Sequence, residues 1–311
     1  MKNLSLLFIA FLFLQITSFA QEGWFLQNPP LPMDNNLVEV HIINSNTVIV
    51  VGESGTILKT INGGISWNSQ ISGTTMALIS VDFIDDNTGW VVGYSGVILN
   101  STNGGYSWNY QTSGTINSLH SIHFNNVNIG WAVGDYGIIL KTTSGGMNWD
   151  ILSTGISFEL SSVKFLNAHT GYIVGLYGNI LKTTNCGVNW SMQFTGTSSY
   201  LFSIHLLDVL TGWIVGNDGK IIKTTNGGVD WIFQISGTTK HLYAVHFTDD
   251  LTGWIVGHDG TILNSTNGGA SWNYQTSGTT NHLFHVNFGN TYTGWVVGYA
   301  GTILKTTNIR C

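Results

Sequence analysis

Four acidic side chains occupy equivalent two-residue turns flanked by glycines: Glu53, Asp135, Asp218 and Asp259. A pair of carboxylates about 5 to 10 Å apart can hydrolyse a glycosidic bond, with one group as the acid and the other as the base or nucleophile. Acids in equivalent turns of a repeating chain lie at separate points of the fold, and Asp is a common turn residue. We therefore assign no catalytic residue and expect a protein that is not an enzyme.

Histidines form a second candidate set, at the fifth position of a six-residue strand pattern that recurs seven times. The residues at this position are, in chain order, His41, Asp82, His123, Lys164, His205, His246 and Asn287. If these strands line a central channel, their side chains could converge on a metal ion or an anion. Lys164 and the irregular order of donors favour a polar, water-lined wall instead, so we expect neither a metal nor a cofactor.

A 41-residue repeat sets the position of all these groups. A glycine recurs without insertion or deletion at Gly52, Gly93, Gly134, Gly175, Gly216, Gly257 and Gly298. A leucine keeps the same spacing from Leu37 to Leu283. Seven repeats of this length are typical of a β-propeller, in which each repeat forms one blade.

One repeat contains four short β-rich segments, at 78–83, 88–93, 96–102 and 107–111. The second and third segments are joined by two residues between glycines, and the third and fourth by "TNGG", sequences that suit the positive φ angles of hairpin turns. The predicted fold is therefore all-β: a seven-bladed β-propeller of four-stranded antiparallel blades, forming a single domain over residues 21–311.

The tryptophans indicate how the ring closes. Six of them begin a fourth strand, from Trp67 to Trp272, but the chain ends at Cys311 before a seventh. The segment "WFLQ" at 24–27 resembles the fourth strands "WNSQ" and "WNYQ". We predict that this amino-terminal strand completes the last blade, which removes the exposed sheet edges of an open array.

The first 20 residues have the features of a signal peptide, with Lys2, an apolar run from Leu4 to Leu14 and a small-residue exit at Ala20. No later stretch is apolar enough to span a membrane, so we expect a secreted protein, either periplasmic or extracellular. We also expect the protein to be a monomer. The formal net charge of −6 and the single arginine, Arg310, argue against a nucleic-acid partner.

The link between the third and fourth strands fits a relaxed Asp-box, Ser/Thr-x-Asp-x-Gly-x-Ser/Thr-Trp, with Asn in place of Asp. One copy consists of Thr60, Asn62, Gly64, Ser66 and Trp67. In this pattern a turn side chain caps backbone amides and the aromatic residue anchors the hairpin. Sialidases share the motif, but they bind the substrate carboxylate with an arginine cluster, which a chain with one arginine lacks.

Together with the recurring "VG..G.ILKTT", the Asp-box copies make the whole mature chain resemble the BNR-repeat propellers of the photosystem II assembly and stability factor family. The resemblance implies a seven-bladed ring and a non-enzymatic protein that binds a membrane protein during its assembly. The photosynthetic members present an arginine-rich patch to their partner, whereas Arg310 is the only arginine here. A carbohydrate-binding or glycoside-hydrolase-like surface protein remains the alternative.

Binding is expected on the face formed by the second-to-third turns and by the links between repeats, which we call the loop face. Its residues differ between repeats, as functional loops on a regular scaffold do. The links contribute Glu159, Lys240 and His282. The candidate contacts to a protein or glycan partner are Glu53, Tyr94, Asp135, Tyr136, Tyr177, Tyr200, Asp218, His241, His258, Asp259 and Tyr299.

Overall fold

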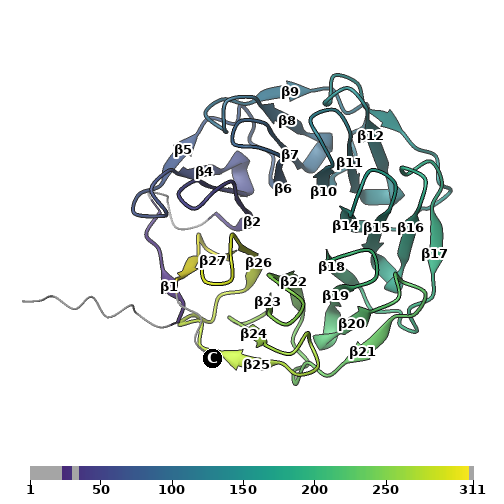
Figure 1. Ribbon diagram of the computed structural model, residues 1–311. Helices are drawn as coiled ribbons and strands as arrows, with labels where there is room; N and C mark the ends of the chain where they lie inside the picture. Colours follow the sequence, from purple (N-terminus) through teal and green to yellow (C-terminus); the bar gives the residue numbers. More distant parts are fainter. Residues whose placement is uncertain (1–22, 30–34, 308–311) are drawn as a thin grey trace, which may run out of the picture.

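The computed structural model describes residues 23–29 and 35–307, which form a closed ring of seven four-stranded antiparallel sheets around a central channel (Figure 1). The predicted seven-bladed propeller is confirmed. The innermost strands are β2 (Leu37–Ile42), β6 (Leu78–Phe83), β10 (Leu119–Phe124), β14 (Leu160–Phe165), β18 (Leu201–Leu206), β22 (Leu242–Phe247) and β26 (Leu283–Phe288). We number the blades from one to seven in this order.

The other strands follow outwards in each blade. The second strands are β3 (Val48–Gly52), β7 (Gly89–Gly93), β11 (Gly130–Gly134), β15 (Gly171–Gly175), β19 (Gly212–Gly216), β23 (Gly253–Gly257) and β27 (Gly294–Gly298). The third strands are β4 (Ile57–Thr60), β8 (Ile98–Ser101), β12 (Ile139–Thr142), β16 (Ile180–Thr183), β20 (Ile221–Thr224), β24 (Ile262–Ser265) and β28 (Ile303–Thr306). The outer strands are β5 (Asn68–Gln70), β9 (Asn109–Gln111), β13 (Asp150–Ile151), β17 (Ser191–Gln193), β21 (Ile232–Gln234), β25 (Asn273–Gln275) and β1 (Phe25–Leu26).

Strand β1 closes the ring as the sequence predicts. It pairs antiparallel with β28, with Phe25 opposite Lys305, so the seventh sheet has the order β1-β28-β27-β26. Trp24, which is 9% exposed, packs edge-on against Trp254 of the sixth blade and Phe288 of the seventh. The predicted signal peptide, Arg310 and Cys311 lie outside the described residues.

The hydrophobic core lies between the blades. Each cluster of buried residues combines the face of one blade with the face of the next, as where Trp90 of blade two stacks on Phe124 of blade three with ring centroids 3.5 Å apart. The Trp90 indole N–H also donates to the carbonyl of Gly145 in that blade. Burial of such large rings contributes a large part of the hydrophobic stabilisation, so the tryptophan columns hold neighbouring blades together.

The glycine that marks the 41-residue period is required by close packing at the end of each second strand. A Cβ atom at Gly93 would lie 2.1 Å from the carbonyl oxygen of Ala77. That carbonyl accepts a hydrogen bond from the next amide, Tyr94 N–H, at 2.9 Å. Any larger residue would therefore push the link between blades away from the second strand.

In the first five blades the turns between second and third strands are short 3-10 segments: η1 (Glu53–Gly55), η2 (Tyr94–Gly96), η3 (Asp135–Gly137), η4 (Leu176–Gly178) and η5 (Asn217–Gly219). In all seven blades the second turn residue has a left-handed φ between 51° and 62°, although none of these residues is glycine. The predicted positive φ angles are therefore present, and they point these side chains out of the loop face.

The Asp-box hairpins form as expected. In the first blade, Thr60 Oγ1 accepts the Gly64 N–H at 2.9 Å and Asn62 Oδ1 accepts the Ser66 N–H at 3.0 Å. Trp67 is buried and packs edge-on against Trp295 of the seventh blade. Asn therefore replaces the Asp of the motif without loss of the capping acceptor.

The innermost strands are bare sheet edges, and side chains from the preceding blade pair with their free amides. Ser80 Oγ accepts the Ile122 N–H at 3.2 Å, and Ser121 Oγ accepts the Val163 N–H at 3.1 Å. In the same way, Glu39 Oε2 accepts the Val81 N–H at 3.1 Å. The polar residue at the third position of these strands therefore has a partly structural role, because an edge amide without a hydrogen-bond partner would lower the stability of the fold.

Candidate functional site: a cup at the mouth of the channel

A cavity of about 420 Å³ lies at the loop-face end of the channel, and side chains from all seven innermost strands line it. Each of these strands shifts register between its first and third residues, as at Leu37 and Glu39. This β-bulge turns both the second and the third residue toward the channel instead of alternating them. We call the cavity the cup.

One side of the cup is aromatic. Tyr200, Phe202, Tyr243 and Phe284 form a continuous arc over blades five, six and seven, with successive ring centroids 4.5, 5.2 and 5.7 Å apart. Three of these rings come from the second residue of an innermost strand. In the other four blades the second residue of that strand is Val38, Ile79, His120 or Ser161. The cup therefore breaks the sevenfold symmetry of the fold and has a distinct aromatic wall, which we call the aromatic arc.

The cup also contains an imidazole between two carboxylates, one of which meets the aromatic arc at Tyr200. His120 Nε2 lies 2.7 Å from Asp135 Oδ1 and 3.6 Å from Glu159 Oε1. The hydroxyl of Tyr200 donates to Glu159, and burial together with this bond raises the pKa of Tyr200 far above its ordinary value. The two acids are therefore held by the protein itself, with His120 filling the space between them.

A third polar group lies lower in the cup. His285 Nε2 is 3.4 Å from Glu39 Oε1, and Lys164 reaches the cup from the fifth position of β14. Burial raises the pKa of Glu39, against the opposing influence of Lys164. Lys164 is the single lysine among the lining residues, which also include Glu53 and Glu159. The lining thus carries more acidic than basic groups.

Of the predicted ring of fifth-position residues, Lys164 lines the cup and the other six do not. Burial lowers the pKa of His123 to about 4 and that of His246 to about 3. Asp82 lies between His41 and His123, at 3.9 and 3.7 Å, and accepts the Phe124 N–H at 2.7 Å. Within the described residues this ring provides no group of three metal-binding atoms close to one another.

The structure distributes the predicted site residues over three places. Glu53, Tyr94 and Tyr200 line the cup, and Asp135 contacts it through His120. Three tyrosines stand at the outer rim and are half or more exposed: Tyr136, Tyr177 and Tyr299.

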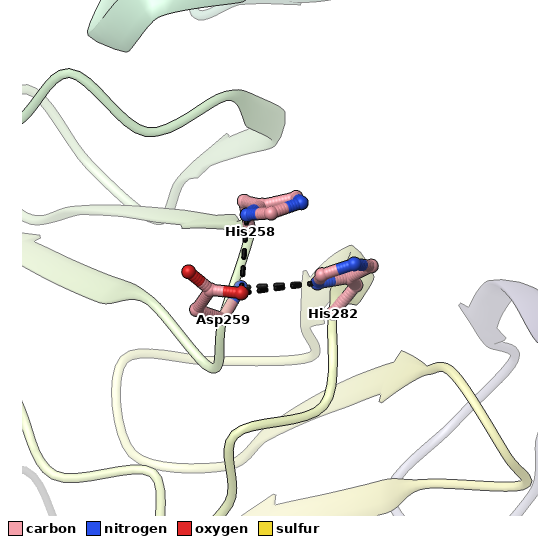
Figure 2. Close-up of side chains that lie close together, drawn as sticks. All are labelled: His258, Asp259 and His282. Atoms are coloured by element: carbon pink, nitrogen blue, oxygen red, sulfur yellow. Dashed lines mark hydrogen bonds and ion pairs between the residues drawn. The ribbon is translucent and has the colours of Figure 1, made fainter.

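The remaining predicted residues form two neighbouring groups at the turns of blades five and six. His241 Nδ1 lies 3.8 Å from Asp218 Oδ1, and His258 Nδ1 lies 3.1 Å from Asp259 Oδ1 (Figure 2). His282, which the sequence places on the loop face through the link between repeats, faces the same Asp259 oxygen at 3.7 Å. Sequence reasoning missed Phe202, Tyr243 and Phe284. The departure of these strand residues from the repeat was the signal that could have found them.

The comparisons with known proteins agree with this architecture. A YCF48 structure described as bound to D1 peptide matches with a TM-score of 0.79 at 19% identity, over 93% of this chain and 96% of that one. YCF48 from Cyanidioschyzon merolae matches with a TM-score of 0.75 at 22% identity, over 91% and 98%. Virginiamycin B lyase from Staphylococcus aureus has the same ring, with a TM-score of 0.79 at 14% identity over 92% and 100%.

No curated protein sequence matches the chain significantly. None of the helical segments in the described part has the length and apolar character needed to cross a membrane. The family model described as photosynthesis system II assembly factor YCF48 matches four overlapping stretches, 17–109, 67–158, 149–240 and 232–309, which together span nearly the whole chain. The chain therefore belongs to the family of photosynthesis system II assembly factor YCF48.

Proposed function

We propose that the protein is an exported, non-catalytic module that binds a segment of another protein in the cup, as an assembly or scaffold factor. The observation that carries this proposal is the cup itself, a 420 Å³ cavity whose aromatic arc interrupts an otherwise regular ring. Apolar clefts with a few fixed polar groups are the usual form of ligand sites. The YCF48 relative described as bound to D1 peptide supports a peptide as the ligand.

The chemistry of the cup favours a particular kind of segment. The aromatic arc offers apolar area to a large side chain, while Glu53 and Glu159 add carboxylates to the lining of the cup. Rings of this kind also attract cations. We expect the bound segment to carry an apolar anchor next to a basic residue, and its affinity to fall as salt concentration rises.

The test is an array of peptides from envelope proteins, to which the wild type and two variants are applied. The variants are Tyr243→Ala and, as a matched control, Tyr274→Ala. Tyr243 belongs to the aromatic arc, whereas Tyr274 is exposed on outer strand β25. Removing an anchoring aromatic ring typically costs 2 kcal/mol or more, so binding to peptides that the wild type captures should weaken about 30-fold in the first variant only. Equal binding by both variants would refute the cup as the site.

Export has a separate test. The apolar run after Lys2 and the small residues before Gln21 are the support for a cleaved signal peptide. Sequencing the amino terminus of protein recovered from the periplasm or culture medium should give Gln21. Recovery of the uncleaved chain from the cytoplasm alone would contradict export.

A glycan is the second candidate ligand, because aromatic rings such as those of the arc also stack on sugars. Asp135 and Glu159 are acids that lie close together, but His120 lies between them and Tyr200 donates to Glu159. An oligosaccharide array decides between the classes: captured glycans whose binding depends on Tyr243, with no captured peptide, would favour this alternative.

A further inference from the structure

Two imidazoles and one carboxylate meet where the sixth blade contacts the seventh. His258 and Asp259 form the turn between β23 and β24, and His282 immediately precedes β26 (Figure 2). His258 Nδ1 and His282 Nδ1 lie 3.1 Å and 3.7 Å from the same atom, Asp259 Oδ1. One donor atom from each side chain lies within 4.8 Å of the other two. The three groups therefore converge on one small volume at the loop face.

The hydrogen bonds of the cluster fix the tautomer of His282. The backbone N–H of Asp259 donates to His282 Nδ1 at 3.1 Å, so this nitrogen carries no proton, and its lone pair is held by that amide until an ion replaces it. The rings of His258 and His282 stack with centroids 3.8 Å apart. Lys240 approaches the other carboxylate oxygen, Asp259 Oδ2, at 3.6 Å, so that Oδ1 faces the two imidazoles.

We propose that His258, Asp259 and His282 form an open binding site for a divalent transition-metal ion such as Zn²⁺. Neutral imidazole nitrogens with one carboxylate are a common donor set for zinc, whereas Ca²⁺ and Mg²⁺ prefer oxygen donors alone. Three protein donors leave a coordination position for water or for a donor from a bound molecule. When the ion binds, it replaces the hydrogen bond that His282 Nδ1 accepts from the Asp259 N–H. Because Asp259 is half-exposed, water can pair with the Asp259 N–H that is released.

The fifth blade contains the same arrangement with one donor missing. The Asp218 N–H donates to His241 Nδ1 at 3.2 Å, and the two side chains lie 3.8 Å apart, as in the sixth blade. Asn217 stands where the sixth blade has His258. Two donors hold zinc far less firmly than three, so the fifth blade should not bind it at micromolar concentration. The chain thus carries its own matched control.

The experiment is a titration of the untagged protein with zinc chloride at pH 7.5, followed by calorimetry and by competition with a chromogenic chelator. The wild type should bind one zinc ion per chain. His258→Asn, which copies the fifth blade into the sixth, should weaken binding at least tenfold. Asn217→His, which copies the sixth blade into the fifth, should raise the stoichiometry to two.

His120→Asn is the second control, because it removes the imidazole from the separate group of His120, Asp135 and Glu159. It should leave zinc binding unchanged, and His258→Asn should melt at the wild-type temperature without metal. The proposal is wrong if the wild type binds no zinc, if His120→Asn abolishes binding instead, or if Asn217→His adds no second ion. None of these measurements needs a protein partner, so they are independent of the proposed function.

Discussion

The histidines of the channel wall carry a pH dependence of stability at the scale of single residues. Burial lowers the pKa of His123 to about 4, below the ordinary value of 6.5. Between these pH values the unfolded chain binds a proton that folded His123 does not, so stability is complete above pH 6.5 and decreases as the pH falls toward 4. At 1.36 kcal/mol per pKa unit, His123 alone accounts for roughly 3 kcal/mol at most.

His123→Asn is the variant that measures this contribution, because the seventh blade already carries Asn287 at the same position. Unfolding by guanidinium at a series of pH values should show a shallower loss of stability between pH 6.5 and 4 than in the wild type. Burial also lowers the pKa of His41 and His205, and it lowers the pKa of His246 and His285 to about 3, so these four histidines should supply the slope that remains. An unchanged slope in the variant would contradict the assignment.

At the scale of elements, the Asp-box turns depend on one buried hydroxyl in each blade. Thr224 Oγ1 accepts the Gly228 N–H at 2.8 Å inside the fifth blade, and Thr224 is 2% exposed. Thr224→Val keeps the shape but leaves that buried amide unpaired, at a cost of about 1–3 kcal/mol. Thr225→Val is the control, because the adjacent Thr225 is exposed. Chemical unfolding that gives equal stability for the two variants would show that the cap is unimportant.

The elements were predictable from sequence because their causes are local. The glycine pair in most hairpins, which is Cys186-Gly187 in the fourth blade, the strand alternation and the recurring tryptophans all act within one repeat. The 41-residue period therefore revealed the blades and the missing last strand. The cup was not predictable in the same way. A β-bulge turns residues such as Phe202 and His285 inward, against simple alternation, and its polar groups meet across blades, as Glu39 meets His285.

At the scale of the whole molecule, ring closure depends on the short strand β1. Trp24 is 9% exposed and lies between Trp254 and Phe288, whereas Leu26 in the same strand is 63% exposed. Trp24→Ala should therefore lower the free energy of unfolding by about 3–5 kcal/mol, and Leu26→Ala by about 0.5 kcal/mol or less. Guanidinium unfolding that finds equal losses would mean that the amino-terminal strand does not hold the ring closed.

The most direct test of the account is photocrosslinking in living cells, with a photoreactive phenylalanine analogue placed in the cup or outside it. The cup position is Phe284, in the aromatic arc, and the control is Tyr274, exposed on the outer strand of the preceding blade. We predict a discrete crosslinked protein from position 284 and none from position 274. Crosslinks from position 274 alone, or the same product from both positions, would contradict the cup as the binding site.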